Sequence, residues 1–342
     1  MEHEIDLKNY EVRTDLAIES VMGYHLKDEP SIHEEEDIKI TEILLNEEEA
    51  KLIGKKAGHY TTIEFDDVTD YANKEKIIHI FGDCLKKMLK ELELDENKSA
   101  LIIGLGNSKS TPDALGPMTI SNIVVTRHLN ELGEMGKGYR VTSAMNTGVM
   151  GETGIETASM IKGVVEETHP DFLITVDALK SGSIDRVNKT IQMTDTGIHP
   201  GSGVGNKRKE ISFDTLGIPV IAVGVPTVVD LVTVVSDTVG YMQKHFSYTK
   251  ENMKKASHKL KMPYQDNYLK KEVKVDAQDK INLLGMVGSL TEEEQKQLFY
   301  EVLTPIGYNM IVTPKEIDFL IEKLSEVIGH GINEALHKII TH

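Results

Sequence analysis

Short apolar segments and helical segments alternate along residues 100–250, and this pattern constrains the fold more than any other feature of the sequence. The apolar segments have the length of strands, and the segments between them repeat their apolar residues at helical spacing. Strands that are apolar throughout, separated by amphipathic helices, are typical of a sheet covered on both faces. We therefore predict an α/β fold, a three-layer α/β/α sandwich around a mostly parallel sheet. The expected strands are ALIIGL, YRVTSAM, DFLITVDAL, TIQM and PVIAVGV.

The segments that flank this pattern are expected to complete a single domain. Residues 29–40 form an acidic run that we interpret as a flexible insertion. Near the C-terminus two segments predict helices that cover the sheet or an oligomer interface. Thr291 is the expected cap of the first helix, and Thr313 is that of the second, with Pro314 at the first helical position. The predicted core lies at about 55–250 and the helical cover at about 286–340.

Charge and composition exclude several classes of protein. The net charge of the 342 residues is -17, and residues 1–50 hold 16 Asp and Glu against 4 Lys and Arg. Such a surface repels nucleic acid and favours a basic protein partner. No segment has the ~18 to 20 apolar residues of a membrane span, and no secretory signal opens the sequence. The single cysteine, Cys84, cannot form an internal disulfide, so we expect a cytoplasmic location and a packing role for Cys84.

The loop LIIGLGNSKSTPDALGP, residues 101–117, resembles a dinucleotide-binding loop only in part. That fingerprint needs three glycines, and Lys109 stands where the third glycine belongs after Gly104 and Gly106. The expected helix also begins late, because Gly116 and Pro117 mark its first turn. A nucleotide-dependent oxidoreductase on a doubly wound sheet therefore remains only an alternative function.

Two aspartates follow predicted strands and are the candidate catalytic residues. Asp113 lies late in the loop after the strand at 101–105, and Asp177 is the first polar residue after the strand at 172–176. Ligands of open α/β sheets collect at the carboxyl ends of the strands. If the two strands are neighbours, the carboxylates face one crevice, where their pKa values separate and the pair activates a water. The alternative for Asp113 is a structural bond to the amides of the following turn.

The same two carboxylates also suit a divalent metal, which would lower the pKa of a bound water. His199 is a third candidate ligand or a proton carrier. The sequence requires no cofactor and does not separate the two mechanisms. Glycine-rich segments at 146–157, 180–186 and 196–209 follow apolar strands, and we interpret them as turns or as backbone that approaches a peptide closely.

Long motifs resemble those of the spore germination proteases over nearly the whole chain. They are IIGLGNSKSTPDALGP, TSAMNTGVMGETGIE, DALKSGSIDRVNKTIQMTDTGIHPGSGVGNKRKEIS and VTPKEID. The resemblance implies an endopeptidase that degrades small acid-soluble spore proteins, with a fold similar to the hydrogenase maturation endopeptidases. By motif, it places the catalytic aspartates at Asp113 and Asp177. It also implies a homotetramer in the spore core.

The resemblance further implies an inactive precursor that removes its own leader. Substrates of the family are cut within Thr-Glu-(Ile or Phe)-Ala-Ser-Glu, after the first glutamate. The stretch Thr14 to Glu19 of this chain copies that pattern, with Asp15 in place of Glu and Ile18 in place of Ser. We therefore expect self-cleavage between Asp15 and Leu16, a propeptide at residues 1–15 and a single domain at 16–342. A non-catalytic scaffold that binds spore proteins is the remaining alternative.

Overall fold

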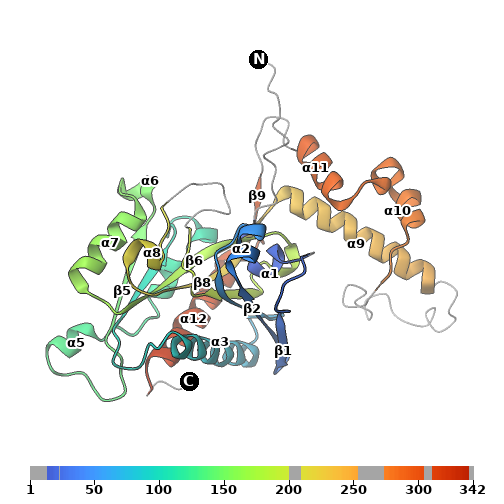
Figure 1. The fold of residues 1–342 in the computed structure, drawn as a ribbon. Helices are drawn as coiled ribbons and strands as arrows, with labels where there is room; N and C mark the ends of the chain where they lie inside the picture. Colours follow the sequence, from blue (N-terminus) through green and yellow to red (C-terminus); the bar gives the residue numbers. More distant parts are fainter. Residues whose placement is uncertain (1–13, 23, 200–208, 253–272, 304–309, 339–342) are drawn as a thin grey trace. The chain divides into compact units, whose positions relative to one another are not determined.

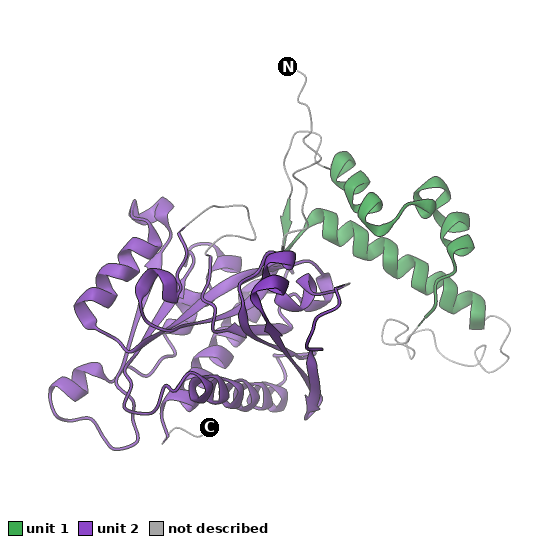
Figure 2. Cartoon of the chain, viewed as in Figure 1, with its two compact units in different colours: residues 1–12, 229–312 green, residues 13–228, 313–342 purple. Residues whose placement is uncertain are grey.

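The structure is a computed structural model that describes residues 14–22, 24–199, 209–252, 273–303 and 310–338. The chain divides into two compact units (Figure 2), one of residues 13–228 and 313–342 and the other of residues 1–12 and 229–312. The boundaries expected from the sequence, a propeptide followed by one domain, stay a prediction.

The strands of the described residues form a mixed sheet in the order β1-β2-β3-β7-β8-β6-β4-β5, and β9 pairs with the end of β8 (Figure 1). β4 lies parallel to both β5 and β6, whereas the ladder β1-β2-β3-β7-β8 is antiparallel. The strands are β1 (Ser31–Glu35), β2 (Ile38–Leu45), β3 (Gly58–Glu64), β4 (Ala100–Leu105), β5 (Thr142–Gly148), β6 (Phe172–Ser181), β7 (Thr190–Thr194), β8 (Val220–Asp230) and β9 (Ile311–Val312).

The acidic run at 29–40 is an ordered hairpin, so its interpretation as a flexible insertion is wrong. β1 and β2 are joined by Glu36 and Asp37, and both residues have positive φ, 50° and 68°. Two residues with positive φ are the mark of the tight hairpin turn whose twist matches that of the strands. β2 then buries Ile38 and Ile40 in the core. The acidic residues hid this alternation, because they occupy the exposed strand and the turn.

Two long helices cover one face of the sheet. α3 (Tyr71–Glu91) and α12 (Ile317–Leu336) contact each other and enclose the largest apolar cluster with the side chains of this face. They pack closely at Gly331, where a Cβ atom would lie 2.3 Å from the ring of Phe81. Cys84 packs against this cluster, and burial raises the pKa of its thiol to about 12. A packing role for Cys84 is therefore confirmed.

The opposite face is covered by α7 (Thr157–Thr168) and by shorter elements. Ile161 of α7 shares a cluster with Leu101 and Ile103 of β4 and Leu173 of β6. α1 (Ala17–Ser20) lies over a third cluster, which includes residues of β2, β3 and β6. The sheet between two helical layers confirms the predicted α/β sandwich. The other short helices of this unit are α2 (Glu47–Ile53), α4 (Leu115–Ile120), α5 (Arg127–Glu131), α6 (Met150–Thr153), α8 (Phe213–Leu216) and the 3-10 helices η2 (Thr111–Asp113) and η3 (Ile184–Arg186).

The smaller unit consists of helices around α9 (Leu231–Asn252), which contacts α10 (Ala277–Leu284) and α11 (Glu292–Leu303). α10 continues into the 3-10 helix η7 (Gly285–Ser289). The cap expected at Thr291 is confirmed: its Oγ1 accepts from the amide of Glu294 at 3.2 Å, and the Glu294 carboxylate accepts from the Thr291 amide at 2.7 Å. No helix of the described residues is long and apolar enough to cross a membrane.

The cap predicted at Thr313 is wrong. α12 begins at Ile317, with Glu316 at the N-cap position, so Pro314 does not occupy the first helical position. The Thr313 hydroxyl instead donates to the carbonyl of Thr227 at 2.9 Å. Because α12 packs against α3 while α11 contacts α9, the two C-terminal helices have different partners.

Candidate functional site

Asp113 is held by the loop that follows β4. Gly106 has φ +108°, and the amide of the next residue, Asn107, donates to the Asp113 carbonyl at 3.1 Å and to its carboxylate at 2.8 Å. A Cβ atom at Gly106 would lie 2.1 Å from the Asp113 carbonyl oxygen. The Asp113 carboxylate thus accepts from an amide that lies before it in the chain, whereas the structural alternative invoked the amides of the following turn. Gly106 serves to close this loop and not to bind a phosphate.

Asp177 lies within β6, not after it, because the strand continues to Ser181. β4 and β6 are neighbouring parallel strands, which meets the condition set for a shared crevice, and their last paired residues are Gly104 and Val176. The 3-10 helix η2, which ends at Asp113, contacts β6. Asp177 is 6% exposed, and by strand alternation it shares a face with Leu179 and Ser181. The elements that carry the two aspartates are therefore in contact.

His199 lies beside an acidic partner, with its side chain 52% exposed. Its Nε2 is 3.4 Å from a carboxylate oxygen of Glu210, which also forms an ion pair with Lys56. Among the residues that the structure describes, no group of three or more His, Cys, Asp or Glu side chains could hold a metal ion. His199, Asp113 and Asp177 thus do not form such a ligand set.

The expected cleavage segment, Thr14 to Glu19, is bound to the sheet, and we call it the docked segment. The Asp15 amide donates to the Lys180 carbonyl at 3.0 Å, and the Lys180 amide donates to the Asp15 carboxylate at 2.9 Å. Gln192 of β7 contacts the chain on both sides of the Asp15–Leu16 bond. Its Nε2 donates to the Asp15 carbonyl at 3.1 Å, and its Oε1 accepts from the Ala17 amide at 2.6 Å.

Glu19, at the end of the docked segment, has a side chain that is only 7% exposed. Its carboxylate accepts from the Ser181 hydroxyl at 2.7 Å and from the Gly182 amide at 2.6 Å. The guanidinium of Arg186 lies 3.5 Å away, and the Thr14 hydroxyl also donates to Glu19. These donors compensate the loss of water around a buried carboxylate.

Apolar burial and a lysine complete the contacts of the docked segment. Leu16 and Ala17 are fully buried, in the same cluster as Leu179 of β6. Lys55 donates to the Thr14 carbonyl at 2.8 Å. Burial lowers the pKa of the Lys55 amine, while the negative charges of Asp15 and Glu19 oppose that shift. Lys55 is thus a cation close to both acids of the segment.

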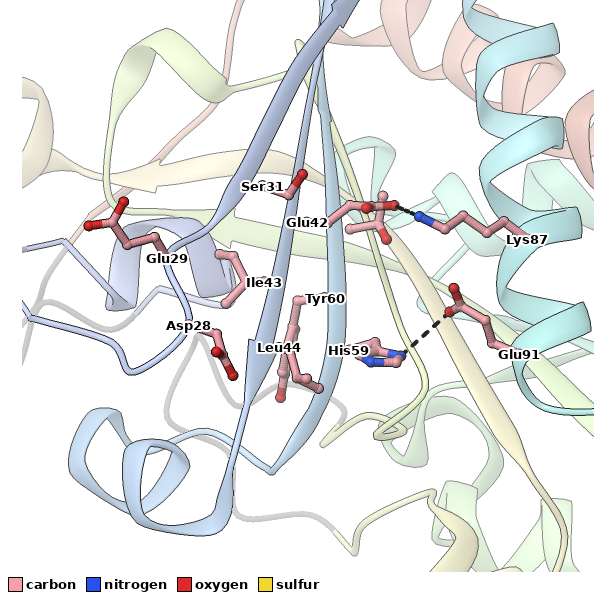
Figure 3. Close-up of a pocket in the computed structure, with 11 residues that line it drawn as sticks. Asp28, Glu29, Ser31, Glu42, Ile43, Leu44, His59, Tyr60, Lys87 and Glu91 are labelled. Atoms are coloured by element: carbon pink, nitrogen blue, oxygen red, sulfur yellow. Dashed lines mark hydrogen bonds and ion pairs between the residues drawn. The ribbon is translucent and has the colours of Figure 1, made fainter.

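A separate pocket lies between β2, β3 and α3 (Figure 3). Four of its charged or titratable groups form two pairs: Glu42 binds Lys87, and Glu91 lies 3.5 Å from His59. None of the residues predicted as catalytic, metal-binding or cleaved lines this pocket. The pocket is therefore separate from the site that the sequence predicted.

Sequence reasoning missed the residues that bind the docked segment, above all Gln192, Arg186 and Ser181. Gln192 carried a signal, since it is a long polar side chain inside the apolar strand TIQM. The segment KSGSIDR was interpreted as a turn or as backbone close to a peptide, without a role for its side chains. Its donors became visible once β6 placed them beside Glu19.

The fold and the docked segment define the class of protein. It is an α/β protein that binds a stretch of polypeptide against its sheet. This stretch has one acid directly before a peptide bond and a second acid at the fourth residue after that bond. The chain belongs to the germination protease family, because the family model described as "Germination protease" matches residues 3–342. It is a protease that acts on protein substrates in spore germination. The resemblance inferred from the motifs is confirmed.

Curated germination proteases from other organisms match this chain over almost their full length. The germination protease of Bacillus licheniformis is 45% identical over 99% of this chain and 96% of its own. That of Geobacillus sp. strain WCH70 is 46% identical over 99% and 97%, and that of Bacillus cytotoxicus is 46% identical over 98% and 96%. Among solved structures, a NiFe hydrogenase maturation protease, HycI from Thermococcus kodakarensis, is 18% identical with a TM-score of 0.28, over 42% of this chain and 80% of its own.

Proposed function

We propose that this protease is made as a precursor that cleaves itself between Asp15 and Leu16, and that it then degrades small acid-soluble spore proteins. The observation that carries the proposal is the docked segment. Its order of threonine, acid, aliphatic residue, alanine and final acid copies the substrate motif, and it is bound through both main-chain and side-chain groups. A surface that binds this pattern within its own chain has the chemistry to bind it in another protein.

Asp113 and Asp177 are the proposed catalytic pair. One carboxylate accepts a proton from a water molecule, whose oxygen attacks the carbonyl carbon of the bond to be cut. The other, protonated, carboxyl gives its proton to the leaving nitrogen, so the C–N bond breaks into a new carboxylate and a new amine. The contact between η2 and β6, and the face that Asp177 shares with Ser181, support this assignment.

The leader is proposed to inhibit by occupancy. While the docked segment lies on β6 and β7, a second polypeptide cannot use the same donors. Release of the segment would free them for the spore proteins. The proposed active form is a homotetramer in the spore core.

Digestion of a purified small acid-soluble spore protein tests this function. The mature enzyme should cut after the first glutamate of Thr-Glu-(Ile or Phe)-Ala-Ser-Glu, as read by mass spectrometry of the fragments, and a substrate with Gln for that glutamate should be cut more slowly. Intact substrate after prolonged incubation would support the scaffold alternative. A rise in melting temperature with NAD would support the oxidoreductase alternative, because a ligand stabilises the folded state that binds it.

A further inference from the structure

The contacts of the docked segment come from a few side chains that no sequence motif assigned to the reaction. We infer that Gln192 aligns the peptide bond to be cut and stabilises its carbonyl oxygen, and that Arg186, with Ser181 and Gly182, reads the acid four residues beyond that bond. This inference deepens the proposed function and rests on cleavage between Asp15 and Leu16.

Gln192 is suited to hold a peptide bond in place because both ends of its amide are used. It is 7% exposed, its Nε2 donates to the Asp15 carbonyl at 3.1 Å, and its Oε1 accepts from the Ala17 amide at 2.6 Å. The Asp15 carbonyl is the group that water would attack. A fixed donor on that oxygen stabilises the negative charge that develops there, and it does so without reorganisation of solvent.

Glu19 is recognised through its negative charge and through the helical turn that positions it. α1 begins at Ala17, with Leu16 as its N-cap, so the turn after the cut bond brings Glu19 back beside Thr14, whose hydroxyl donates to it. Ser181 and Gly182 supply two short hydrogen bonds, and Arg186 supplies the positive charge at 3.5 Å. Hydrogen bonds to a charged group discriminate more strongly than neutral ones.

The substrate class follows from these contacts. It is a peptide that forms a helical turn immediately after the cut bond and carries an acid at the fourth place beyond it. The second residue beyond the cut bond must donate its amide hydrogen to Gln192. It must also have a small side chain, because Ala17 is fully buried. Proline at that place removes the hydrogen and should abolish cleavage.

A double-mutant cycle on self-cleavage of the full chain tests the reading of Glu19. Glu19→Gln and Arg186→Gln should each slow the first-order rate by about tenfold, and the double variant should be no slower than either single variant. Arg186 also lies 3.2 Å from Glu64, and Lys39 pairs with Glu64 at the same distance. The control cycle therefore combines Glu19→Gln with Lys39→Gln, which removes a partner of Glu64 and keeps Arg186. That control pair should be additive. Additive effects for Glu19 and Arg186, or faster cleavage of either single variant, would overturn the inference.

Gln192→Glu tests the alignment of the cut bond, because it keeps the shape of the side chain and removes the donor. Self-cleavage should slow by at least about 100-fold. Thr194→Val, on the same face of β7, should cleave at the rate of the wild type. The melting temperature of each variant, read beside the rate, shows whether it is folded. A folded Gln192→Glu chain that cleaves at the wild-type rate would overturn the assignment.

Different experimental results would contradict the proposed function and the inference about Gln192 and Arg186. If the wild-type chain is never cut between Asp15 and Leu16, the proposed function and this inference both fall. If it is cut there while the Gln192 and Arg186 variants behave like their controls, only the inference falls.

Discussion

Individual glycines set the geometry around Asp113. Gly106 combines positive φ with contact to the Asp113 backbone, whereas Gly133 has positive φ, 72°, and nothing within 4 Å of its missing Cβ. The sequence indicated that the glycine pair at 104 and 106 was not a nucleotide loop, because Lys109 breaks the fingerprint. It could not show that Gly106 closes the loop on Asp113, since that contact depends on the path of the six intervening residues.

Replacement of these two glycines separates backbone strain from contact with Asp113. Gly133→Ala should lower the free energy of unfolding by about 1 kcal/mol, the cost of positive φ alone. Gly106→Ala should lower it by at least about 2 kcal/mol, because the added Cβ also displaces the Asp113 backbone, and proteolysis should be lost. Urea unfolding and a peptide-cleavage assay measure both effects. Equal effects of the two substitutions would contradict the described role of Gly106.

At the scale of elements, secondary structure was predicted correctly where a residue pattern is typical of one kind of element only. The strands β4 and β6 were predicted from their continuous apolar runs. The hairpin β1–β2 was missed because its turn uses Glu36 and Asp37 instead of glycine. The start of α12 was misplaced because Thr313 donates to another strand, a tertiary contact that no local signal encodes.

The contact between α3 and α12 makes Gly331 a packing position. Gly331→Ala should lower the free energy of unfolding by about 1 to 3 kcal/mol, because its Cβ would overlap the ring of Phe81. Gly163→Ala is the matched control, since Gly163 is an exposed residue within α7 with nothing near its missing Cβ. That substitution should stabilise by about 0.5 to 1 kcal/mol through helix propensity. Chemical denaturation should therefore give opposite signs, and a common sign would contradict the packing.

Asp171 joins the starts of β4 and β6. Burial alone would raise the pKa of its carboxyl, but hydrogen bonds from the Ser99 amide and hydroxyl, at 2.7 and 2.8 Å, and the Lys98 amine lower the pKa below its usual value. A lowered pKa in the folded state means that the stabilisation is present above the unfolded pKa of about 3.9 and is lost as pH falls through the folded value.

Stability curves across pH test this junction. At pH 7, Asp171→Asn should lower the free energy of unfolding by about 1 kcal/mol, a value reduced for the exposure of the ion pair with Lys98. The difference from wild type should shrink as pH falls below about 4. Asp185→Asn, a change at an exposed carboxylate, serves as control. A deficit of Asp171→Asn that is constant down to the acid limit would contradict the account.

At the scale of the whole molecule, the sheet and the loops at its strand ends carry the two acids, and the sheet binds a stretch of the protein's own chain. Two apolar runs predicted the strands β4 and β6, but not that they are neighbours, and the run of β6 was expected to end before Asp177, which lies within the strand. The docked segment was predictable as a motif but not as a bound peptide. Its contacts with Lys180, Gly182 and Gln192 join residues more than 150 positions apart, and only the folded chain brings them together.

Intact-mass measurement of self-cleavage tests the central claim most directly. Wild type, Asp113→Asn, Asp177→Asn and the control Asp185→Asn are incubated at mildly acidic pH, with and without a chelator. The account predicts loss of residues 1–15 from wild type and from Asp185→Asn, and no cleavage of either catalytic variant; loss of cleavage with the chelator would assign the water to a metal. Cleavage between Asp15 and Leu16 at the wild-type rate in Asp113→Asn or Asp177→Asn would contradict the account.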